Sequence, residues 1–288
     1  MLKLAIVNTH PIQYYSPFYR HLADCEGLNV RVFYEWRGAL DDSYDPGFQQ
    51  SVTWDIPLLD GYDYIFVDNV ASDPGTHHFR GIVAPDLIDE VEEWGPDAML
   101  IFGWNYQTHL RALRHFHGRL PVLFRGDSIL LDESPGPKQW VRRLALRWIY
   151  RYVDRALYVG QNNRAYYEAH GFTDDELTWV PHAIDNDRFA QADDADAEAQ
   201  KWRRAIGIPD DAPVAVFAGK LESKKAPDVL LDAFLDLPKD GASGTGEAAP
   251  HLAVVGSGPM EDALKRRAVH RSNVHFLGFQ NQSRMPVV

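Results

Sequence analysis

Short apolar runs that end at a glycine or a polar turn recur along the chain and predict β-strands. The first half contains residues 3–7, 28–34, 98–102, 121–124 and 154–159, and the second half contains residues 214–218, 251–255 and 274–277. Apolar residues at helical spacing follow most of these runs, as they do after Pro227. Strands that alternate with helices are typical of an α/β protein with a parallel sheet.

One stretch, VAVFAGKLESKK at residues 214–225, joins a predicted strand to a basic loop. The apolar run 214–218 predicts a strand that is buried on both faces, and Pro227 suits the first turn of a helix. Lys220 and Lys225 then lie at the carboxyl end of a strand, beside the positive end of a helix dipole. Both features favour an anion, most often a phosphate. A solvated lysine loop gives the same pattern, so that interpretation stays open.

The next two predicted strands repeat this plan. Residues 251–255 lead into the turn Gly256-Ser257-Gly258-Pro259, and residues 274–277 end at Gly278. Three successive strands that end in glycine turns predict half of a nucleotide-binding α/β domain. In contrast, the first strand-to-helix loop, residues 8–15, lacks G-x-G-x-x-G and therefore carries no dinucleotide fingerprint.

Four segments carry a resemblance to a known family. They are LTWVPHAIDNDRF at 177–189, AGKLESKKAPDVLLDAF at 218–234, VVGSGPMEDAL at 254–264 and VHFLGFQNQSRMP at 274–286. In this order, they resemble four segments of the retaining GT-B glycosyltransferases of the family four group. These are the interdomain segment, the G-[RK]-L-x3-K-[GA] segment, the glycine-proline turn and the strand that follows it. His182 and Ala183 replace the Asn-Gly of the family's interdomain segment.

The resemblance implies a GT-B fold, an α/β architecture of two Rossmann-like domains that face a cleft. Residues 1–185 would form the N-terminal, acceptor-side domain, and residues 186–288 the C-terminal domain that binds the nucleotide sugar. The implied donor-binding residues are Gly219, Lys220, Lys225, Gly256, Gly258 and Phe279. The implied catalytic residues are Asp127, Lys220 and Lys225, with Asp127 where the family commonly has a histidine.

The same resemblance places the loop 8–15 and the end of strand 121–124 near the acceptor. The implied acceptor-binding residues are His10, Gln13, Tyr14 and Arg125. A loop that is packed by its own aromatic side chains is the alternative for residues 8–15. Residues 44–73 form a polar, aromatic connection that predicts a lid or an acceptor-side loop.

The chemistry implied by the resemblance is sugar transfer with retention. Charge builds on the β-phosphate of the leaving nucleoside diphosphate, and fixed cations such as Lys220 and Lys225 stabilise it. The nucleotide sugar is then a co-substrate, and neither a cofactor nor a metal ion is expected.

The family's E-x7-E element would follow Pro286, but the sequence ends at Val288, so a C-terminally truncated second domain is expected. Three functions remain open. The first is a glycosyltransferase or its N-terminal part, the second is a truncated, inactive sugar-nucleotide-binding protein, and the third is a GT-B sugar-nucleotide epimerase.

The composition of the chain limits the classes of partner and the cellular compartment that can be expected. The chain has 29 Lys and Arg against 41 Asp and Glu, and the net charge of −12 argues against nucleic acid. Cys25 is the only cysteine, which excludes an intrachain disulfide and suits a reducing compartment. Residues 1–7 are too short for an export signal, and no run approaches the roughly 20 apolar residues of a membrane span. A cytoplasmic protein is expected.

Residues 139–153 combine arginines with tryptophans and aliphatic residues at helical spacing. This pattern predicts a basic amphipathic helix, which would suit peripheral contact with anionic lipid on the inner face of the membrane. The alternative is that the apolar stripe belongs to the core and the arginines are simply exposed. Polysaccharide or glycolipid biosynthesis is the process that the family suggests.

Overall fold

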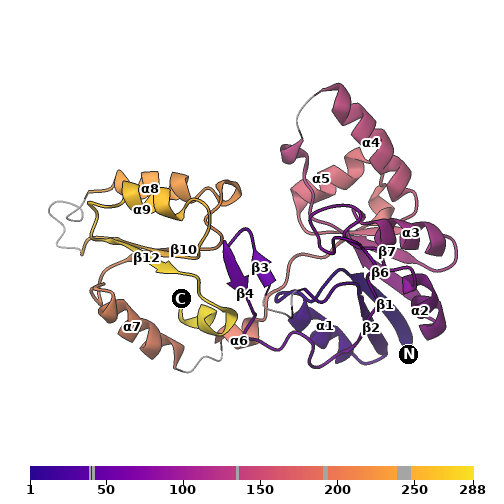
Figure 1. The fold of residues 1–288 in the computed structure, drawn as a ribbon, viewed down its shortest axis with the longest axis horizontal. Helices are drawn as coiled ribbons and strands as arrows, with labels where there is room; N and C mark the ends of the chain where they lie inside the picture. The colour runs from indigo at the N-terminus through magenta and orange to yellow at the C-terminus, as the bar shows by residue number, and fades with distance from the viewer. Residues whose placement is uncertain (39, 41–42, 134–135, 191–193, 239–247) are drawn as a thin grey trace. The chain divides into compact units, whose positions relative to one another are not determined.

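The computed structural model describes residues 1–38, 40, 43–133, 136–190, 194–238 and 248–288. The chain forms two compact units (Figure 1). Unit 1 contains Met1–Asp41 and Pro57–Ile184, and unit 2 contains Asp42–Ile56 and Asp185–Val288. Unit 2 therefore takes a segment from between two parts of unit 1, which the prediction of two consecutive domains, 1–185 and 186–288, did not anticipate.

Unit 1 is built on a seven-stranded parallel sheet. In spatial order its strands are β5 (Asp63–Phe66), β2 (Leu28–Tyr34), β1 (Leu2–Asn8), β6 (Ala98–Phe102), β7 (Val122–Arg125), β8 (Arg155–Tyr158) and β9 (Leu177–Trp179). The strands predicted from apolar runs in the first half are thus confirmed. β1 alternates its buried side chains between the two faces, because successive side chains of a strand point to opposite sides.

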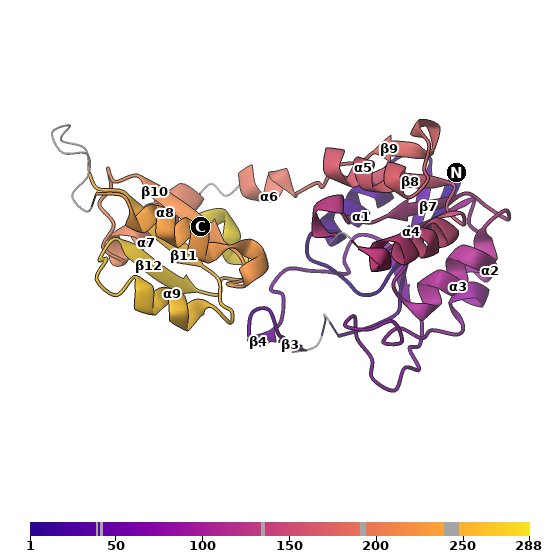
Figure 2. The same ribbon diagram turned by 90° about the horizontal axis from the view of Figure 1, so that it is seen from above.

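Helices cover both faces of this sheet (Figure 2). Ala5 and Val7 of β1 face a core that includes side chains of α2 (Leu87–Trp94), α3 (Gln107–Phe116), α4 (Pro137–Tyr150) and α5 (Gln161–Ala169). Leu4 and Ile6 face the other core, to which α1 (Ser16–Ala23) contributes the fully buried Tyr19. The 3-10 turns η1 (Leu130–Asp132) and η2 (Asp174–Glu176) lie in connections.

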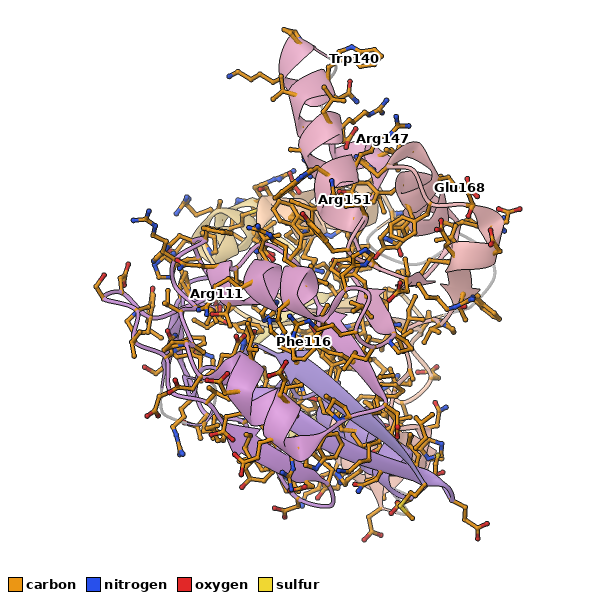
Figure 3. The ribbon with its side chains drawn as sticks, turned by 90° about the vertical axis from the view of Figure 1, so that its right-hand side faces the viewer. Arg111, Phe116, Trp140, Arg147, Arg151 and Glu168 are labelled. Carbon is orange, nitrogen blue, oxygen red and sulfur yellow. The ribbon has the colours of Figure 1, made fainter. Side chains whose placement is uncertain are left out.

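Helix α4 is only partly covered by unit 1 (Figure 3). Its C-terminal half buries Leu146, Ile149 and Tyr150. Exposed apolar side chains run along its other face, and their exposed fractions are 71% for Trp140, 68% for Val141, 67% for Leu144 and 43% for Trp148. The interpretation of the whole apolar stripe as core is therefore wrong, because the first turns of the helix extend beyond the sheet that could cover them.

Unit 2 contains a three-stranded parallel sheet in the order β10 (Val214–Ala218), β11 (His251–Val255) and β12 (Val274–Gly278). Side chains of α8 (Pro227–Leu235) and α9 (Glu261–Arg267) pack on it to form the core of this unit. Its other short elements are α6 (Asn186–Ala190), α7 (Ala195–Ala205), η3 (Ser223–Lys225) and η4 (Gln282–Val287).

The prediction that residues 214–218 are buried on both faces is wrong. Ala215, Val216 and Ala218 are exposed, with Val216 at 46%. Among the residues that the structure describes, β10 pairs with β11 alone, whereas β11 has a strand on each side and is buried along nearly its whole length. A continuous apolar run does not by itself distinguish these two positions in a sheet.

An antiparallel hairpin of β3 (Ser43–Asp45) and β4 (Gln50–Val52) also belongs to unit 2. It arises from the polar, aromatic connection that was predicted to be a lid or an acceptor-side loop. Figure 1 shows the hairpin beside the β10–β12 sheet.

Candidate functional site

A cavity of about 260 Å³ lies at the carboxyl edge of the unit 1 sheet. The loops after β1, β6 and β7 supply most of its lining. β1 and β6 are neighbours, but β2 continues the sheet on one side and β7 on the other. The chain connections therefore diverge at this point, which is where open parallel sheets place their ligand sites.

Four residues predicted from sequence line this cavity, namely His10, Tyr14, Arg125 and Asp127. Gln13, in the described loop before α1, does not occur in the lining. The Asp127 carboxylate is exposed at the edge of the sheet. His182, which replaces an Asn of the family motif, also lines the cavity.

His10 is held neutral by its surroundings. Burial lowers the pKa of His10 to about 4. Its Nδ1 lies 2.8 Å from the Thr9 hydroxyl, and its ring packs edge-on against Trp36 with 5.4 Å between centroids. A neutral imidazole at the cavity wall can exchange a hydrogen bond with a sugar hydroxyl without adding charge.

Arg125 is buried, and backbone carbonyls engage its guanidinium. Nη1 donates to the Val180 carbonyl at 2.8 Å and Nη2 to the Pro181 carbonyl at 3.3 Å. These bonds fix the segment that follows β9, and they direct two of the arginine's donors to the protein's own backbone. Fewer of its N–H donors are consequently free for a ligand, while the guanidinium keeps its positive charge.

A buried pair that sequence reasoning missed lies beneath this cavity. The His109 Nε2 is 2.6 Å from the Glu35 Oε2, and both side chains are fully buried. Burial alone would lower the pKa of His109, but the Glu35 carboxylate and the Gly103 carbonyl raise it on balance. Nδ1 donates to the Gly103 carbonyl at 3.0 Å, and Gly103 lines the cavity. Only tertiary structure joins these residues, 74 positions apart, so no local motif could reveal them.

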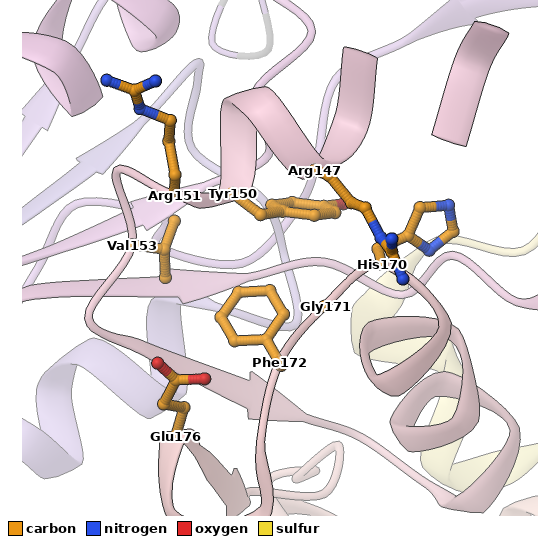
Figure 4. Close-up of a pocket in the computed structure, with 8 residues that line it drawn as sticks. All are labelled: Arg147, Tyr150, Arg151, Val153, His170, Gly171, Phe172 and Glu176. Carbon is orange, nitrogen blue, oxygen red and sulfur yellow. The ribbon is translucent and has the colours of Figure 1, made fainter. Parts of the chain in front are cut away.

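A second cavity of unit 1, about 500 Å³, lies away from the predicted residues (Figure 4). It is lined by Arg147, Tyr150, Arg151, Val153, His170, Gly171, Phe172 and Glu176. Val153 lies two residues before β8 and Glu176 directly precedes β9, so this cavity is near the amino ends of those strands. The Glu176 carboxylate already accepts from the Thr173 backbone N–H and hydroxyl. This position and this pairing do not favour it as the substrate site.

Asp73, His77 and His78 form a cluster with the ligand types of a metal site. The His78 Nδ1 accepts from the Arg80 backbone N–H, which places its proton on Nε2, 3.1 Å from the Asp73 carbonyl. Both nitrogens of His78 are thus used by the protein. A hydrogen bond from His77 and the positive potential of the two histidines lower the pKa of Asp73, and an ion-paired surface cluster accounts for this arrangement.

In unit 2, the glycine turns after β10, β11 and β12 pack against one another at the carboxyl edge of the sheet. Gly219 donates its N–H to the Val255 carbonyl at 2.9 Å, and Gly256 donates to the Gly278 carbonyl at 2.7 Å. A Cβ at Gly256 would lie 1.9 Å from the Gly219 oxygen, and Gly256 has φ +131°. Only glycine allows these turns to approach so closely.

The predicted donor-binding side chains surround these turns. Lys220 follows Gly219 and is two-thirds buried. Lys225 lies in η3, is exposed and precedes the first turn of α8 by two positions. Phe279 follows β12 and packs edge-on against Phe48 of the hairpin, with 4.9 Å between centroids. Lysine ammonium groups and the N-terminus of a helix are the kinds of group that attract a phosphate.

Comparison with solved structures identifies the fold class. The chain superposes over its whole length on Alr3699/HepE from Anabaena in complex with UDP and glucose, with a TM-score of 0.61, 15% identity and 71% of that chain covered. It matches the UDP-GlcNAc 2-epimerase from Neisseria meningitidis bound to UDP-GlcNAc with a TM-score of 0.60 and 13% identity, covering 99% of this chain and 74% of that one. The predicted α/β GT-B fold is confirmed. At these identities the likeness shows the fold alone.

Sequence comparison then adds a match to a family model over part of the chain. Residues 198–288 match the model of glycosyl transferases group 1, so the predicted resemblance is confirmed over this part. The D-inositol 3-phosphate glycosyltransferase from Xylanimonas cellulosilytica is 36% identical over 86 residues, which are 27% of this chain and 21% of that relative. The matched part thus spans about a fifth of the relative's length.

Proposed function

We propose that the chain acts in a glycosyltransferase that moves a sugar, with retention, from a nucleoside diphosphate sugar to a glycan or lipid-linked acceptor. The observation that carries this proposal is the group of three glycine turns with Lys220 at the carboxyl edge of β10–β12. It falls within the residues that match glycosyl transferases group 1. The nucleotide-bound structural relatives support a UDP sugar as the first donor to try.

Each side of the reaction has its own residues in this proposal. Lys220 and Lys225 stabilise the charge that develops on the leaving diphosphate. The departing phosphate takes up the acceptor proton, so neither a cofactor nor a metal ion is invoked. His10, Tyr14 and Asp127 position the acceptor hydroxyl in the unit 1 cavity, because they supply neutral and acidic hydrogen-bonding groups at its wall.

The test is a product analysis of the 288-residue chain with UDP- and GDP-sugars and a panel of glycan and lipid-linked acceptors. We expect nucleoside diphosphate release that depends on an acceptor, and an anomeric configuration in the product that matches the donor. Inversion at the anomeric carbon would exclude the retaining mechanism. Donor binding without transfer or hydrolysis would favour the inactive sugar-nucleotide-binding protein.

An epimerase is the second candidate, because a UDP-GlcNAc 2-epimerase shares the fold with a TM-score of 0.60. It predicts that UDP-GlcNAc is converted to its 2-epimer without any acceptor. Incubation with donor alone, followed by NMR of the sugar ring protons, separates it from a transferase. The match of residues 198–288 favours transfer.

For the acceptor side we propose a peripheral contact of α4 with the inner face of a membrane, in polysaccharide or glycolipid assembly by a cytoplasmic protein. Trp140, Val141 and Leu144 are exposed on this helix, and Arg147 and Arg151 follow on adjacent turns (Figure 3). Exposed aromatic and basic side chains on one helix suit anionic lipid. In the described part of the chain, no helix is both long and apolar enough to cross a bilayer.

A further inference from the structure

The hairpin β3–β4 contacts the loops that follow all three strands of the unit 2 sheet. After β10, Lys220 pairs with Asp45, and after β11, the Ser257 hydroxyl donates to the Phe48 carbonyl at 2.7 Å. After β12, Phe279 packs on Phe48 of the hairpin, and the Asn281 side-chain amide donates at 2.7 Å to the carbonyl of Thr53, which directly follows β4. These loops form the carboxyl edge where a parallel sheet binds its ligand. The hairpin therefore covers the proposed donor site.

The central contact is the ion pair of Lys220 with Asp45, in which the carboxylate is bound as an anionic ligand would be. Both carboxylate oxygens of Asp45 lie 2.9 Å from the Lys220 Nζ. The same carboxylate accepts the backbone N–H groups of Gly47 at 2.8 Å and Phe48 at 3.2 Å. Only 33% of the Lys220 side chain and 27% of the Asp45 side chain are exposed. A phosphate oxygen would seek the same ammonium donors.

The hairpin also approaches the glycine turns too closely for a ligand to lie between them. A Cβ on Gly258 would be 2.9 Å from the Gly47 carbonyl oxygen, and a Cβ on Gly47 would be 2.8 Å from the Lys220 Nζ. The Lys220 Nζ also lies 4.9 Å from the centroid of the Phe48 ring. A diphosphate at Lys220 would thus have to displace the Asp45 carboxylate.

We infer that Asp45 occupies the diphosphate position of the donor site, so that the hairpin is an intramolecular competitor that a nucleoside diphosphate must displace. This inference rests on the proposed function for the identity of the ligand. Because UDP binds only those molecules in which the hairpin has left the site, the apparent affinity for UDP equals the intrinsic affinity multiplied by the fraction of such molecules. Removal of the Asp45 charge weakens the covered state and also removes a repulsive charge beside the bound phosphates.

The test compares UDP binding by calorimetry in the parent, Asp45→Asn and Asp236→Asn. The Asn side chain keeps an oxygen that can accept from Gly47 and Phe48, so the turn is retained while the charge is lost. Asp236→Asn removes the same charge at the far end of α8 and serves as the matched control. We expect UDP to bind Asp45→Asn about tenfold more tightly than the parent and to bind Asp236→Asn as it binds the parent.

Hydrogen exchange of residues 43–56 gives a readout that a purely structural hairpin would not change. We expect saturating UDP to increase exchange in the parent, because the hairpin leaves the site. Slower exchange with UDP, or UDP binding to Asp45→Asn that equals or falls below binding to the parent, would overturn the competitor role and make the hairpin a permanent wall. Absence of UDP binding in both proteins would overturn the proposed donor site itself, and this inference with it.

Discussion

The two units place candidate sites at the same kind of edge but line them with different chemical groups. The unit 1 cavity has a neutral His10, and its Arg125 donates to two backbone carbonyls. In unit 2, the edge has glycine turns, Lys220 in an ion pair with Asp45, and the exposed Lys225 ahead of α8. A hydroxyl-bearing acceptor suits the first environment and a diphosphate suits the second. The topology of a parallel sheet thus determines that a site lies at its carboxyl edge, and the side chains there determine which ligand it can bind.

The units also differ in how their sheets are covered. Helix side chains pack on both faces of the seven-stranded sheet of unit 1. The β10 strand of unit 2 is half exposed at the edge of three strands. Unit 1 buries the side chains of Glu35 and His109 completely, whereas the Lys220–Asp45 pair of unit 2 leaves 33% and 27% of its side chains exposed.

The largest expected effect is on catalysis. We expect Lys220→Ala to lower turnover about a hundredfold, because it removes a fixed cation from the leaving diphosphate. Lys224→Ala is the matched control, an exposed lysine four positions away, and should keep parental turnover. Steady-state nucleotide release measures both, and equal activity of Lys220→Ala and the parent would refute the chemical contrast between the units.

The next effect concerns the buried pair in unit 1. We expect Glu35→Gln to lower the free energy of unfolding by about 3 kcal/mol, because it leaves His109 buried without its counter-charge. The pKa of His109 is raised above its ordinary value. The pair's contribution is therefore fully present below about pH 6.5 and is lost as the pH rises through the raised pKa.

Urea unfolding at pH 6 and pH 9 measures this effect, and the difference between parent and Glu35→Gln should shrink at the higher pH. Glu92→Gln breaks the exposed pair with His115 and is the control, with an unchanged midpoint expected. A pH-independent difference would show that packing alone holds the pair.

His10 gives the opposite pH dependence. Its folded pKa of about 4 lies below the unfolded value of 6.5, so the unfolded chain binds the proton first as the pH falls. Stability should fall between about pH 6.5 and pH 4 by about 2 kcal/mol through this group. His10→Gln should flatten that slope in urea titrations, whereas the exposed His270→Gln should not. Parallel slopes for parent and His10→Gln would contradict a neutral His10 at the cavity wall.

The smallest effect should appear on α4. We expect Trp140→Ser with Leu144→Ser to weaken binding to vesicles that contain anionic lipid about fivefold, because the exposed apolar contacts are lost. Val70→Ser, at another exposed apolar residue with 64% exposure, is the control. Co-sedimentation measures binding, and thermal unfolding should be unchanged in all variants. Equal sedimentation of the parent and the double variant would exclude lipid contact through this face.

Sequence patterns predicted much of the architecture because strands and helices have short periods. The apolar run at residues 98–102 became the fully buried β6, and the turn from Gly256 to Gly258 follows β11 as expected. The run at residues 214–218 misled for a physical reason. An edge strand with one covered face and a central strand can share one composition, since their number of neighbours is a tertiary property.

The candidate sites show the same limit. Lys220 could be predicted from its place between a strand and a helix, but its pairing with Asp45, 175 positions earlier, could not. Likewise, Glu35 directly follows β2 and shows no local signal for its pairing with His109. Whether the residues assigned to the donor and the acceptor bind them stays a prediction. Local periodicity is enough to predict helices and strands, whereas the pairing of charges far apart in the sequence depends on how the helices and strands assemble.

The hairpin belongs to unit 2 but lies early in the sequence, and this limits where the protein can be cut into separately expressed fragments. A recombinant fragment that starts at Asp185 would lack Phe48 and Thr53, and it would present their partners Phe279 and Asn281 to solvent. Such a piece should aggregate or express poorly, and supplying a synthetic peptide of residues 43–56 should rescue it. A cut in the chain between residues 40 and 43, or after Ile56, would test whether unit 2 depends on residues 43–56. Units 1 and 2 would stay covalently joined at residue 184 after such a cut.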